Sequence, residues 1–149
     1  MKKVELFIRV KQKIYKLNIE TIPVGYILID GDNESAVSRV SNTSAMPQQS
    51  IGKIVDTAIA GEYLGMKLIY LEAGSGAKTP VNERIIKAVS EAITIPLIVG
   101  GGIWDGQSAR RAVHAGADWV VTGSLTEEFD DPDELQRTLS QLISNIGST

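Results

Sequence analysis

The sequence contains no cysteine and only one histidine among its 149 residues. The lack of cysteine excludes disulfide scaffolds, thiolate zinc sites and cysteine nucleophiles. One histidine also excludes metal sites built from several imidazoles, and a Ser-His-Asp triad could use only His114. His114 falls in a segment of helical pattern away from the strand ends, so we expect it on the surface.

The sequence also lacks an excess of positive charge and any long apolar run. Fifteen Lys and Arg residues face 18 Asp and Glu residues, which gives a net charge of -3. This balance argues against a nucleic-acid partner, because phosphate neutralisation needs a dense basic face. No stretch approaches the ~20 apolar residues that span a bilayer, and the N-terminus does not resemble a signal peptide. We expect a cytoplasmic protein without an integral membrane span.

What is present fits one folded domain over residues 1–149, with 43% hydrophobic and 22% charged residues. Apolar spacing predicts a leading helix over 4–17, and the chain then alternates between strands and helices. We expect strands over 21–30, 67–72, 96–99 and 118–121, and helices over 51–64, 80–93, 105–115 and 131–146. Residues 33–50 predict a long loop. Ser50 should cap the second helix, with Gly65 as its end. The last helix should bury a stripe of apolar residues: Leu135, Leu139, Leu142, Ile143 and Ile146.

The predicted strands are continuous apolar runs, which indicates burial on both faces and parallel pairing, hence an α/β fold. A (β/α)8 barrel takes about 250 residues, so this chain has the length of the last four strand–helix units of such a barrel. A self-contained doubly wound sheet is the alternative, but glycine-rich loops after three successive strands favour the parallel (β/α) half-barrel. A half-barrel leaves two open sheet edges, which need another copy of the chain or a missing amino-terminal half.

Two glycine-rich loops indicate a phosphate site. Gly100-Gly101-Gly102 and Gly123-Ser124 follow the last two strands, where barrels often bind phosphate through backbone N–H groups. The alternative is that these glycines only make tight turns. Trp104 and Trp119 flank the loops, and we expect both to serve in packing.

A further group of candidates follows the second strand. Alternation places Tyr70 and Glu72 on one side of that strand, and Ser75 comes shortly after it. Glu72 could accept hydrogen bonds from substrate hydroxyls or act as a base, while an ion pair with Lys67, Lys78 or Arg84 is the structural alternative. Asp30 and Asp32 end the first strand, and we interpret them as turn residues rather than metal ligands.

Three segments together resemble the geranylgeranylglyceryl phosphate synthases, archaeal-type prenyltransferases to which the heptaprenylglyceryl phosphate synthases are related. They are Tyr70-Leu71-Glu72-Ala73-Gly74-Ser75-Gly76-Ala77, Pro96-Leu97-Ile98-Val99-Gly100-Gly101-Gly102-Ile103 and Gly116-Ala117-Asp118-Trp119-Val120-Val121-Thr122-Gly123-Ser124. Residues 21–26 and 60–65 are similar to that family as well. The resemblance covers about residues 18–130.

The resemblance implies a modified (β/α)8 barrel that transfers a geranylgeranyl group from its diphosphate to the 3-hydroxyl of sn-glycerol 1-phosphate, the first ether bond of archaeal membrane lipids. Carried over by motif, Glu72 would be catalytic. Glycerol phosphate would be held by Tyr70, Leu71, Glu72, Ala73, Gly74, Ser75, Gly76, Gly101, Gly102, Gly123 and Ser124. Many relatives have Asn at the position of Ser124. The serine side chain is shorter, but the backbone N–H donors are the same.

The resemblance also implies Mg2+, with ligands on early barrel strands that lie outside this chain, so we expect no metal site within it. The chain would then keep the glycerol-phosphate half of the site and lack the metal half. Two alternatives remain open. One is a different phosphate-binding half-barrel enzyme, such as an isomerase or a synthase of amino-acid biosynthesis. The other is a non-catalytic phosphate-binding or assembly subunit.

Overall fold

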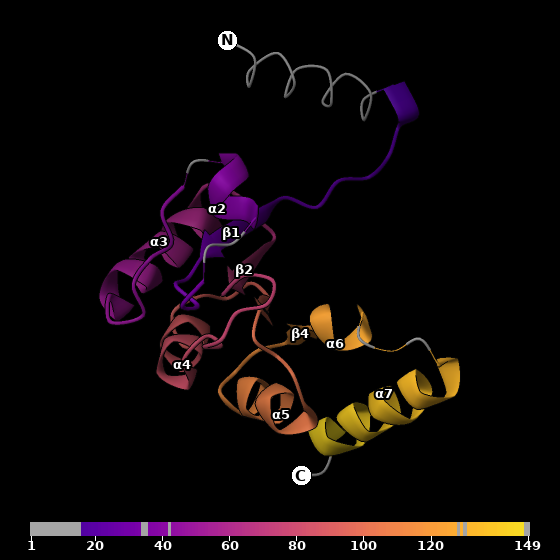
Figure 1. Cartoon of the computed structure of the whole chain (residues 1–149). Helices are drawn as coiled ribbons and strands as arrows, with labels where there is room; N and C mark the ends of the chain where they lie inside the picture. Colours follow the sequence, from indigo (N-terminus) through magenta and orange to yellow (C-terminus); the bar gives the residue numbers. More distant parts are fainter. Residues whose placement is uncertain (1–15, 34–35, 42, 128, 130, 148–149) are drawn as a thin grey trace.

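The computed structural model describes residues 16–33, 36–41, 43–127, 129 and 131–147. The helix expected over 4–17 lies almost wholly outside the described residues. The described part contains a single parallel sheet whose strands alternate with helices (Figure 1).

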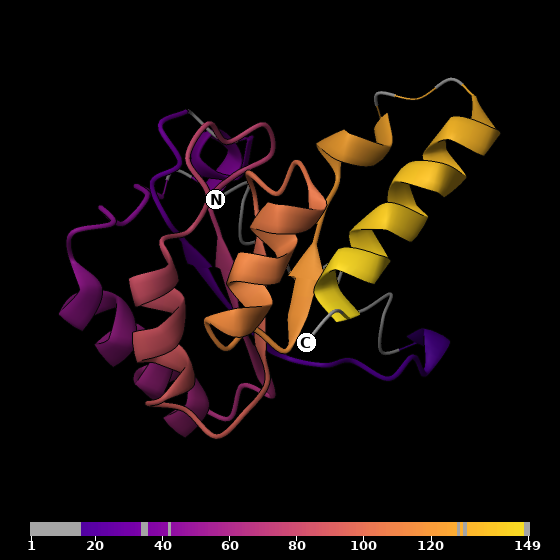
Figure 2. The same cartoon turned by 90° about the horizontal axis from the view of Figure 1, so that it is seen from below.

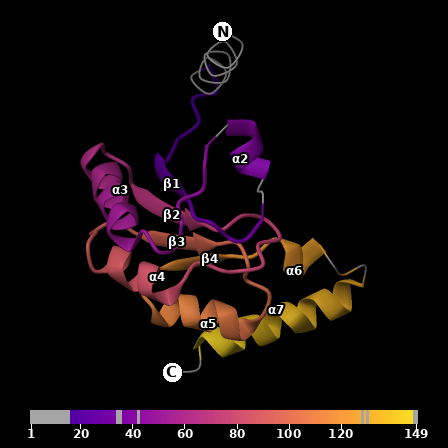
Figure 3. The same cartoon turned by 60° about the vertical axis from the view of Figure 1, so that its left-hand side comes forward.

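The sheet confirms the predicted fold class. Its strands are β1 (Val24–Leu28), β2 (Leu68–Glu72), β3 (Leu97–Gly100) and β4 (Trp119–Val121), paired in parallel in the order β1-β2-β3-β4. The helices α3 (Ile51–Tyr63), α4 (Glu83–Ser90) and α5 (Gly106–His114) cover one side of it (Figure 3). A doubly wound sheet reverses its strand order and carries helices on both faces. Sequential order with helices on one face is the arrangement of a barrel segment.

Local sequence signals explain most helix ends. The Asn82 side chain accepts from the Arg84 N–H at 2.9 Å and begins α4, and Asp105 with Ser108 forms a capping box at the start of α5. Gly65 follows α3 with a φ of +90°, in the left-handed region that glycine adopts without strain. The prediction for Ser50 was wrong, because its side chain makes no capping hydrogen bond.

Two short helices were not predicted. The helix α2 (Ala36–Ser41) lies within the expected loop over 33–50, and α6 (Ser124–Glu127) follows β4. With six and four residues, they are too short to show a helical apolar period. Both lie at the carboxyl end of the sheet (Figure 3), and this places them beside the glycine-rich loops.

The two faces of the sheet differ in burial. The side chains of Ile69, Leu71 and Val99 point toward the helices and are fully buried in the main core. On the opposite face, called here the inner face, four side chains are 40–55% exposed: Val24, Tyr26, Trp119 and Val121. The expectation of burial on both faces is therefore wrong for β1 and β4, because nothing in the described part of the chain covers these inner-face residues.

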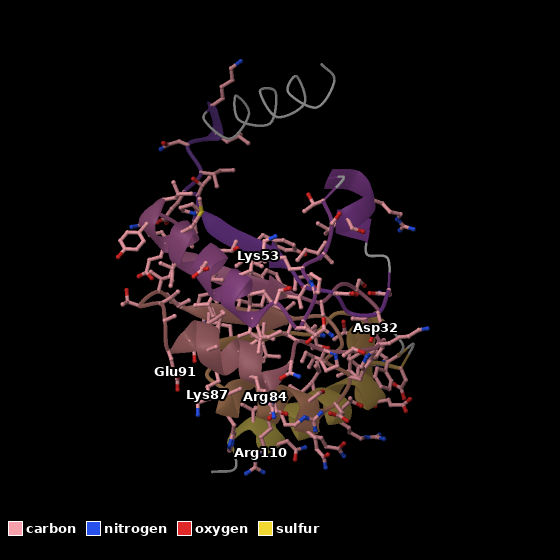
Figure 4. The ribbon with its side chains drawn as sticks, turned by 90° about the vertical axis from the view of Figure 1, so that its left-hand side faces the viewer. Asp32, Lys53, Arg84, Lys87, Glu91 and Arg110 are labelled. Carbon is pink, nitrogen blue, oxygen red and sulfur yellow. The ribbon has the colours of Figure 1, made fainter. Side chains whose placement is uncertain are left out.

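The outer side of the helices is polar. Lys53 on α3, Arg84, Lys87 and Glu91 around α4, and Arg110 on α5 carry their charges on this side (Figure 4). Lys87 and Glu91 lie 3.9 Å apart as an exposed pair one helical turn apart. The outer side of the helices is charged, whereas the inner face of the sheet is apolar. A further protein layer would therefore lie against the inner face.

The last helix, α7 (Pro132–Gly147), packs along α5 (Figure 2). As expected, the side chain of Asp131 begins it by accepting from the Asp133 N–H at 3.0 Å. Its apolar stripe is narrower than expected: Leu142 is 9% exposed in a small core with Ile103, Ala109 and Leu125, whereas Ile143 is 67% exposed. Contact with one helix rather than with a sheet buries only a narrow stripe.

Adjacent positions on α7 give a matched test of this packing. Leu142→Ala should lower the free energy of unfolding by about 2 kcal/mol, because it removes buried methyl groups and leaves a cavity. Ile143→Ala should change it by less than about 0.5 kcal/mol, since the side chain is already in solvent. Urea unfolding followed by circular dichroism measures both, and equal losses would contradict the packing described.

Candidate active site

Loops at the carboxyl ends of the strands surround a pocket of about 270 Å³. Eight of the residues predicted for the site line it: Tyr70, Glu72, Gly74, Ser75, Gly76, Gly101, Gly102 and Gly123. They come from three segments separated by more than 20 residues, after β2, β3 and β4. The parallel order of the sheet brings these segments together, because all strands end at the same edge.

Three of the predicted residues are not brought to the pocket. Leu71 and Ala73 are 0% and 1% exposed and belong to the helix-facing core. Strand alternation turns their side chains away from those of Tyr70 and Glu72. Ser124 begins α6 next to Gly123, and its side chain lies outside the described residues.

Six lining residues were not predicted for the site: Tyr26, Val37, Ile103, Trp104, Val121 and Thr122. Tyr26 pairs in register with Tyr70 across β1 and β2, and the two rings meet edge to face with centroids 5.1 Å apart. Trp104 was expected to serve in packing, but it is 39% exposed and forms part of the pocket wall. Trp119, also expected to pack, is 55% exposed on the inner face.

Glu72 is the carboxylate of the pocket, and its side chain is only 8% exposed. Its Oε1 accepts from the N–H of Gly74 at 2.8 Å, and its Oε2 and the Tyr70 hydroxyl both lie beside Gly100. Among the described residues Glu72 has no ion pair, so the alternative of a salt bridge to Lys67, Lys78 or Arg84 is wrong. The carboxylate is held by a backbone donor.

The same carboxylate affects both tyrosines. Burial, followed by the negative charge of Glu72, raises the pKa of Tyr26 to about 12. Burial and the hydrogen bond to Glu72 raise the pKa of Tyr70 further. Both hydroxyls therefore stay protonated at neutral pH and can donate hydrogen bonds.

Two glycines of the pocket leave room for no side chain. A Cβ on Gly100 would meet Glu72 Oε2 at 2.8 Å and collide with the Tyr70 hydroxyl. Gly101 has a φ of +80°, and a Cβ there would lie 2.6 Å from the Gly74 nitrogen and 2.7 Å from Glu72 Oε1. The β3 loop therefore passes directly against the carboxylate and the β2 loop, as only glycine permits.

The pocket offers backbone donors to a ligand. Among the described residues, the N–H groups of Ser75, Gly76, Gly101, Gly102 and Gly123 donate to no protein acceptor. Positive φ angles at Gly76, Gly101 and Gly102 produce the kind of backbone concavity that binds anions. The described lining contains neither Lys nor Arg. An anion bound here would be held by backbone N–H groups.

The β1 loop supports the pocket from outside. Asp30 accepts the Asp32 N–H at 3.1 Å, which confirms the predicted turn, and Asp32 in turn accepts from the Thr79 hydroxyl. The Asn33 amide donates to the Ser75 carbonyl at 3.0 Å. These contacts leave the two aspartates engaged in loop structure rather than directed at a shared metal.

The described residues do not fit a Mg2+ site. No group of three or more Asp, Glu, His or Cys gathers among them, whereas Mg2+ is bound through oxygen ligands that usually include carboxylates. The one carboxylate of the pocket, Glu72, already accepts a hydrogen bond from the Gly74 N–H. Elsewhere, His114 is exposed at the end of α5, 3.4 Å from Arg110 Nε, which confirms its expected surface position.

No helix in the described part of the chain is long and apolar enough to cross a membrane.

The fold and the pocket define a (β/α) barrel-type protein with a pocket rich in free backbone N–H groups at the carboxyl ends of its strands. Residues 6–142 match the model of the PcrB family, and the chain belongs to that family. The match covers every strand and all the loops that line the pocket.

Named relatives are similar over most of this chain. A geranylgeranylglyceryl phosphate synthase from Zunongwangia profunda is 48% identical over 124 residues, which are 83% of this chain and 53% of that protein. Wild-type GGGPS from Thermoplasma volcanium superposes with a TM-score of 0.87 at 36% identity, covering 98% of this chain and 57% of that one. The (S)-3-O-geranylgeranylglyceryl phosphate synthase from Thermoplasma acidophilum, solved with its substrate sn-glycerol-1-phosphate, gives 0.86 at 30% identity, over 95% and 56% of the two chains. The chain thus spans about half the length of the relatives it matches.

Two glycines that both line the pocket allow a test of the close approach. Gly101→Ala should cost about 1–3 kcal/mol of unfolding free energy, because it combines a left-handed backbone with a collision against the β2 loop. Gly123→Ala should cost less than about 1 kcal/mol, since a Cβ there meets nothing within 4 Å. Urea titrations of both variants measure the difference, and a fully stable Gly101→Ala chain would contradict the geometry.

The tyrosine pKa values predict an alkaline loss of stability. The raised pKa of Tyr26 contributes stability that is complete below the ordinary value of 10.0 and is lost as the pH rises through about 12. Glu72→Gln should lower the pKa of Tyr26 and Tyr70, because it removes the neighbouring negative charge. Tyrosinate absorbance during alkaline titration reports both, with Glu91→Gln as an exposed control. Identical titration of the parent and Glu72→Gln chains would disprove the contact.

Proposed function

We propose that this chain supplies the glycerol-phosphate half of a geranylgeranylglyceryl phosphate synthase. The observation that carries the proposal is the pairing, in one pocket, of a buried carboxylate with unpaired backbone N–H groups. A carboxylate accepts hydrogen bonds from hydroxyl groups, whereas the N–H groups suit an anion. A small molecule with hydroxyls at one end and a phosphate at the other satisfies both.

The names of the relatives support the choice of substrate. The Thermoplasma acidophilum protein is solved with sn-glycerol-1-phosphate, and its structure superposes on 95% of this chain. In the proposed arrangement Glu72 accepts from the glycerol hydroxyls, while Gly101, Gly102 and Gly123 donate to the phosphate. Tyr26 on β1 and Tyr70 on β2 line the same pocket, where their hydroxyls would donate hydrogen bonds to the substrate.

In the proposed reaction the 3-hydroxyl oxygen of sn-glycerol 1-phosphate forms a bond to C1 of the geranylgeranyl group. The bond between that carbon and the diphosphate oxygen breaks, diphosphate leaves, and the hydroxyl proton is released. Glu72 orients the hydroxyl and accepts its proton. The product carries the first ether bond of an archaeal-type membrane phospholipid.

The prenyl diphosphate requires groups that the pocket lining does not offer. Two phosphoryl groups carry several negative charges, and a carboxylate with neutral N–H groups cannot neutralise them. We assign that role, together with any Mg2+, to the other half of a complete barrel, which would also cover Val24, Tyr26, Trp119 and Val121 on the inner face. An amino-terminal half or a second copy of the chain would supply that half.

Calorimetric titration of the chain with sn-glycerol 1-phosphate, without Mg2+, tests the substrate assignment. We expect saturable binding with a clear preference over sn-glycerol 3-phosphate, because Glu72 and the N–H groups fix both ends of the ligand. Equal binding of both enantiomers and of inorganic phosphate would favour a phosphate-binding half-barrel of other specificity. No binding of any of the three would contradict the proposal for the chain alone.

Glu72→Gln should weaken the binding of sn-glycerol 1-phosphate by roughly ten- to a hundredfold, which corresponds to the loss of a hydrogen bond to a charged group. The amide also places an N–H where Gly74 or the substrate needs an acceptor. Glu91→Gln, on the outside of α4, is the matched control. An affinity of Glu72→Gln equal to that of the parent would remove Glu72 from the site.

A further inference from the structure

The loop after β2, residues 73–79, is a glycine-dependent wall of the pocket. Gly74 and Gly76 have φ angles of +104° and +70°, and Ser75 and Gly76 are exposed to solvent. Glycine adopts these angles freely and also leaves them freely, so the loop has little conformational preference of its own. Its shape must be set by neighbouring groups.

On the β1 side, backbone and side-chain bonds supply this support. The N–H of Lys78 donates to the Gly31 carbonyl at 3.0 Å, and Asn33 donates to Ser75. Ala77 is fully buried, and its N–H donates to the Gly74 carbonyl at 3.1 Å. Ala77 is therefore the fixed point of the loop.

On the β3 side, two hydrogen bonds support the loop. The Ala73 N–H donates to the Gly100 carbonyl at 2.9 Å where the strands end, and Trp104 Nε1 donates to the Ala77 carbonyl at 3.2 Å farther along the loop. Trp104 follows Gly101 and Gly102, both of which have positive φ angles, so its own loop is also glycine-dependent. The indole bond therefore joins the two loops at Ala77, which is fully buried.

We propose that Trp104 is a positioning residue of the binding site, whose indole N–H holds the glycine loop after β3 against the glycine loop after β2. This hydrogen bond sets the spacing between the N–H groups of Ser75 and Gly76 and those of Gly101 and Gly102. An anion that contacts both loops binds best when this spacing is fixed before it arrives, because no ordering cost remains. The indole ring also forms pocket wall, but that contribution is separate from its hydrogen bond.

Phenylalanine separates the two contributions. Trp104→Phe keeps an aromatic wall and removes the donor, since indole Nε1 is the only polar group of the side chain. Trp119→Phe is the matched control, because Trp119 is 55% exposed and does not line the pocket. Trp104 is itself 39% exposed, so little packing is lost on substitution.

The first readout needs no ligand. Amide hydrogen exchange of Ala77, Lys78 and Thr79, which donate within the loop or to Gly31, should become roughly two- to tenfold faster in Trp104→Phe. Exchange in α4 and the thermal midpoint should stay near the parent values. In the parent chain, the indole N–H of Trp104 should exchange more slowly than that of Trp119, which tests the bond without any substitution. Unchanged amide exchange, or equal indole exchange, would overturn the proposal.

The second readout rests on the proposed function. The affinity for sn-glycerol 1-phosphate should fall by roughly two- to tenfold in Trp104→Phe and stay unchanged in Trp119→Phe. Faster loop exchange with unchanged affinity would overturn the positioning role. If the parent chain binds no glycerol phosphate, the proposed function fails, and the exchange measurements still decide whether Trp104 holds the two loops together.

Discussion

The hydrogen bond from the Gly74 N–H to the Glu72 carboxylate is the constraint on which the pocket depends. It holds a buried negative charge at the mouth of β2 and turns the chain sharply into the loop that follows. The fixed carboxylate requires Gly100 and Gly101 on the next strand, because any side chain there would meet it. Burial, together with this charge, raises the pKa of Tyr26 and Tyr70. One interaction thereby determines the shape, the donors and the acceptor of the site.

In the described part of the chain, helices cover only one face of the sheet around this pocket. Helices α3, α4 and α5 bury the outward side chains of the central strands, whereas Tyr26, Trp119 and Val121 remain exposed on the inner face. The relatives are about twice as long, and the chain superposes on 57% of the Thermoplasma volcanium structure. Exposed apolar groups along two open edges are costly for an isolated sheet. A layer that covered them would also close the pocket against water.

The sequence predicted what depends on local spacing. Continuous apolar runs gave the four parallel strands, and glycines directly after them gave the pocket, since both features are read within a few residues. Tyr26 and Trp104 were missed as site residues because their positions depend on strand register and on a contact between loops 27 residues apart. The side chains of Leu71 and Ala73 lie in the core and not in the pocket, because a motif carried over whole ignores strand alternation. The exposure of Ile143 followed from α7 packing on one helix, which no period in the sequence specifies.

The chemistry of the pocket indicates which groups of a complete site would lie on each half of the barrel. A hydroxyl nucleophile needs an acceptor held in a fixed orientation, and Glu72 meets that need because the Gly74 N–H holds its carboxylate. A departing diphosphate needs positive charge, yet the described lining contains neither Lys nor Arg and its only charged group is negative. Placing the cations next to Glu72 would pair them with the carboxylate and remove its free acceptor capacity. In the proposed function, an acceptor on one half of a barrel and cations on the other would not pair with each other before the substrates bind between them.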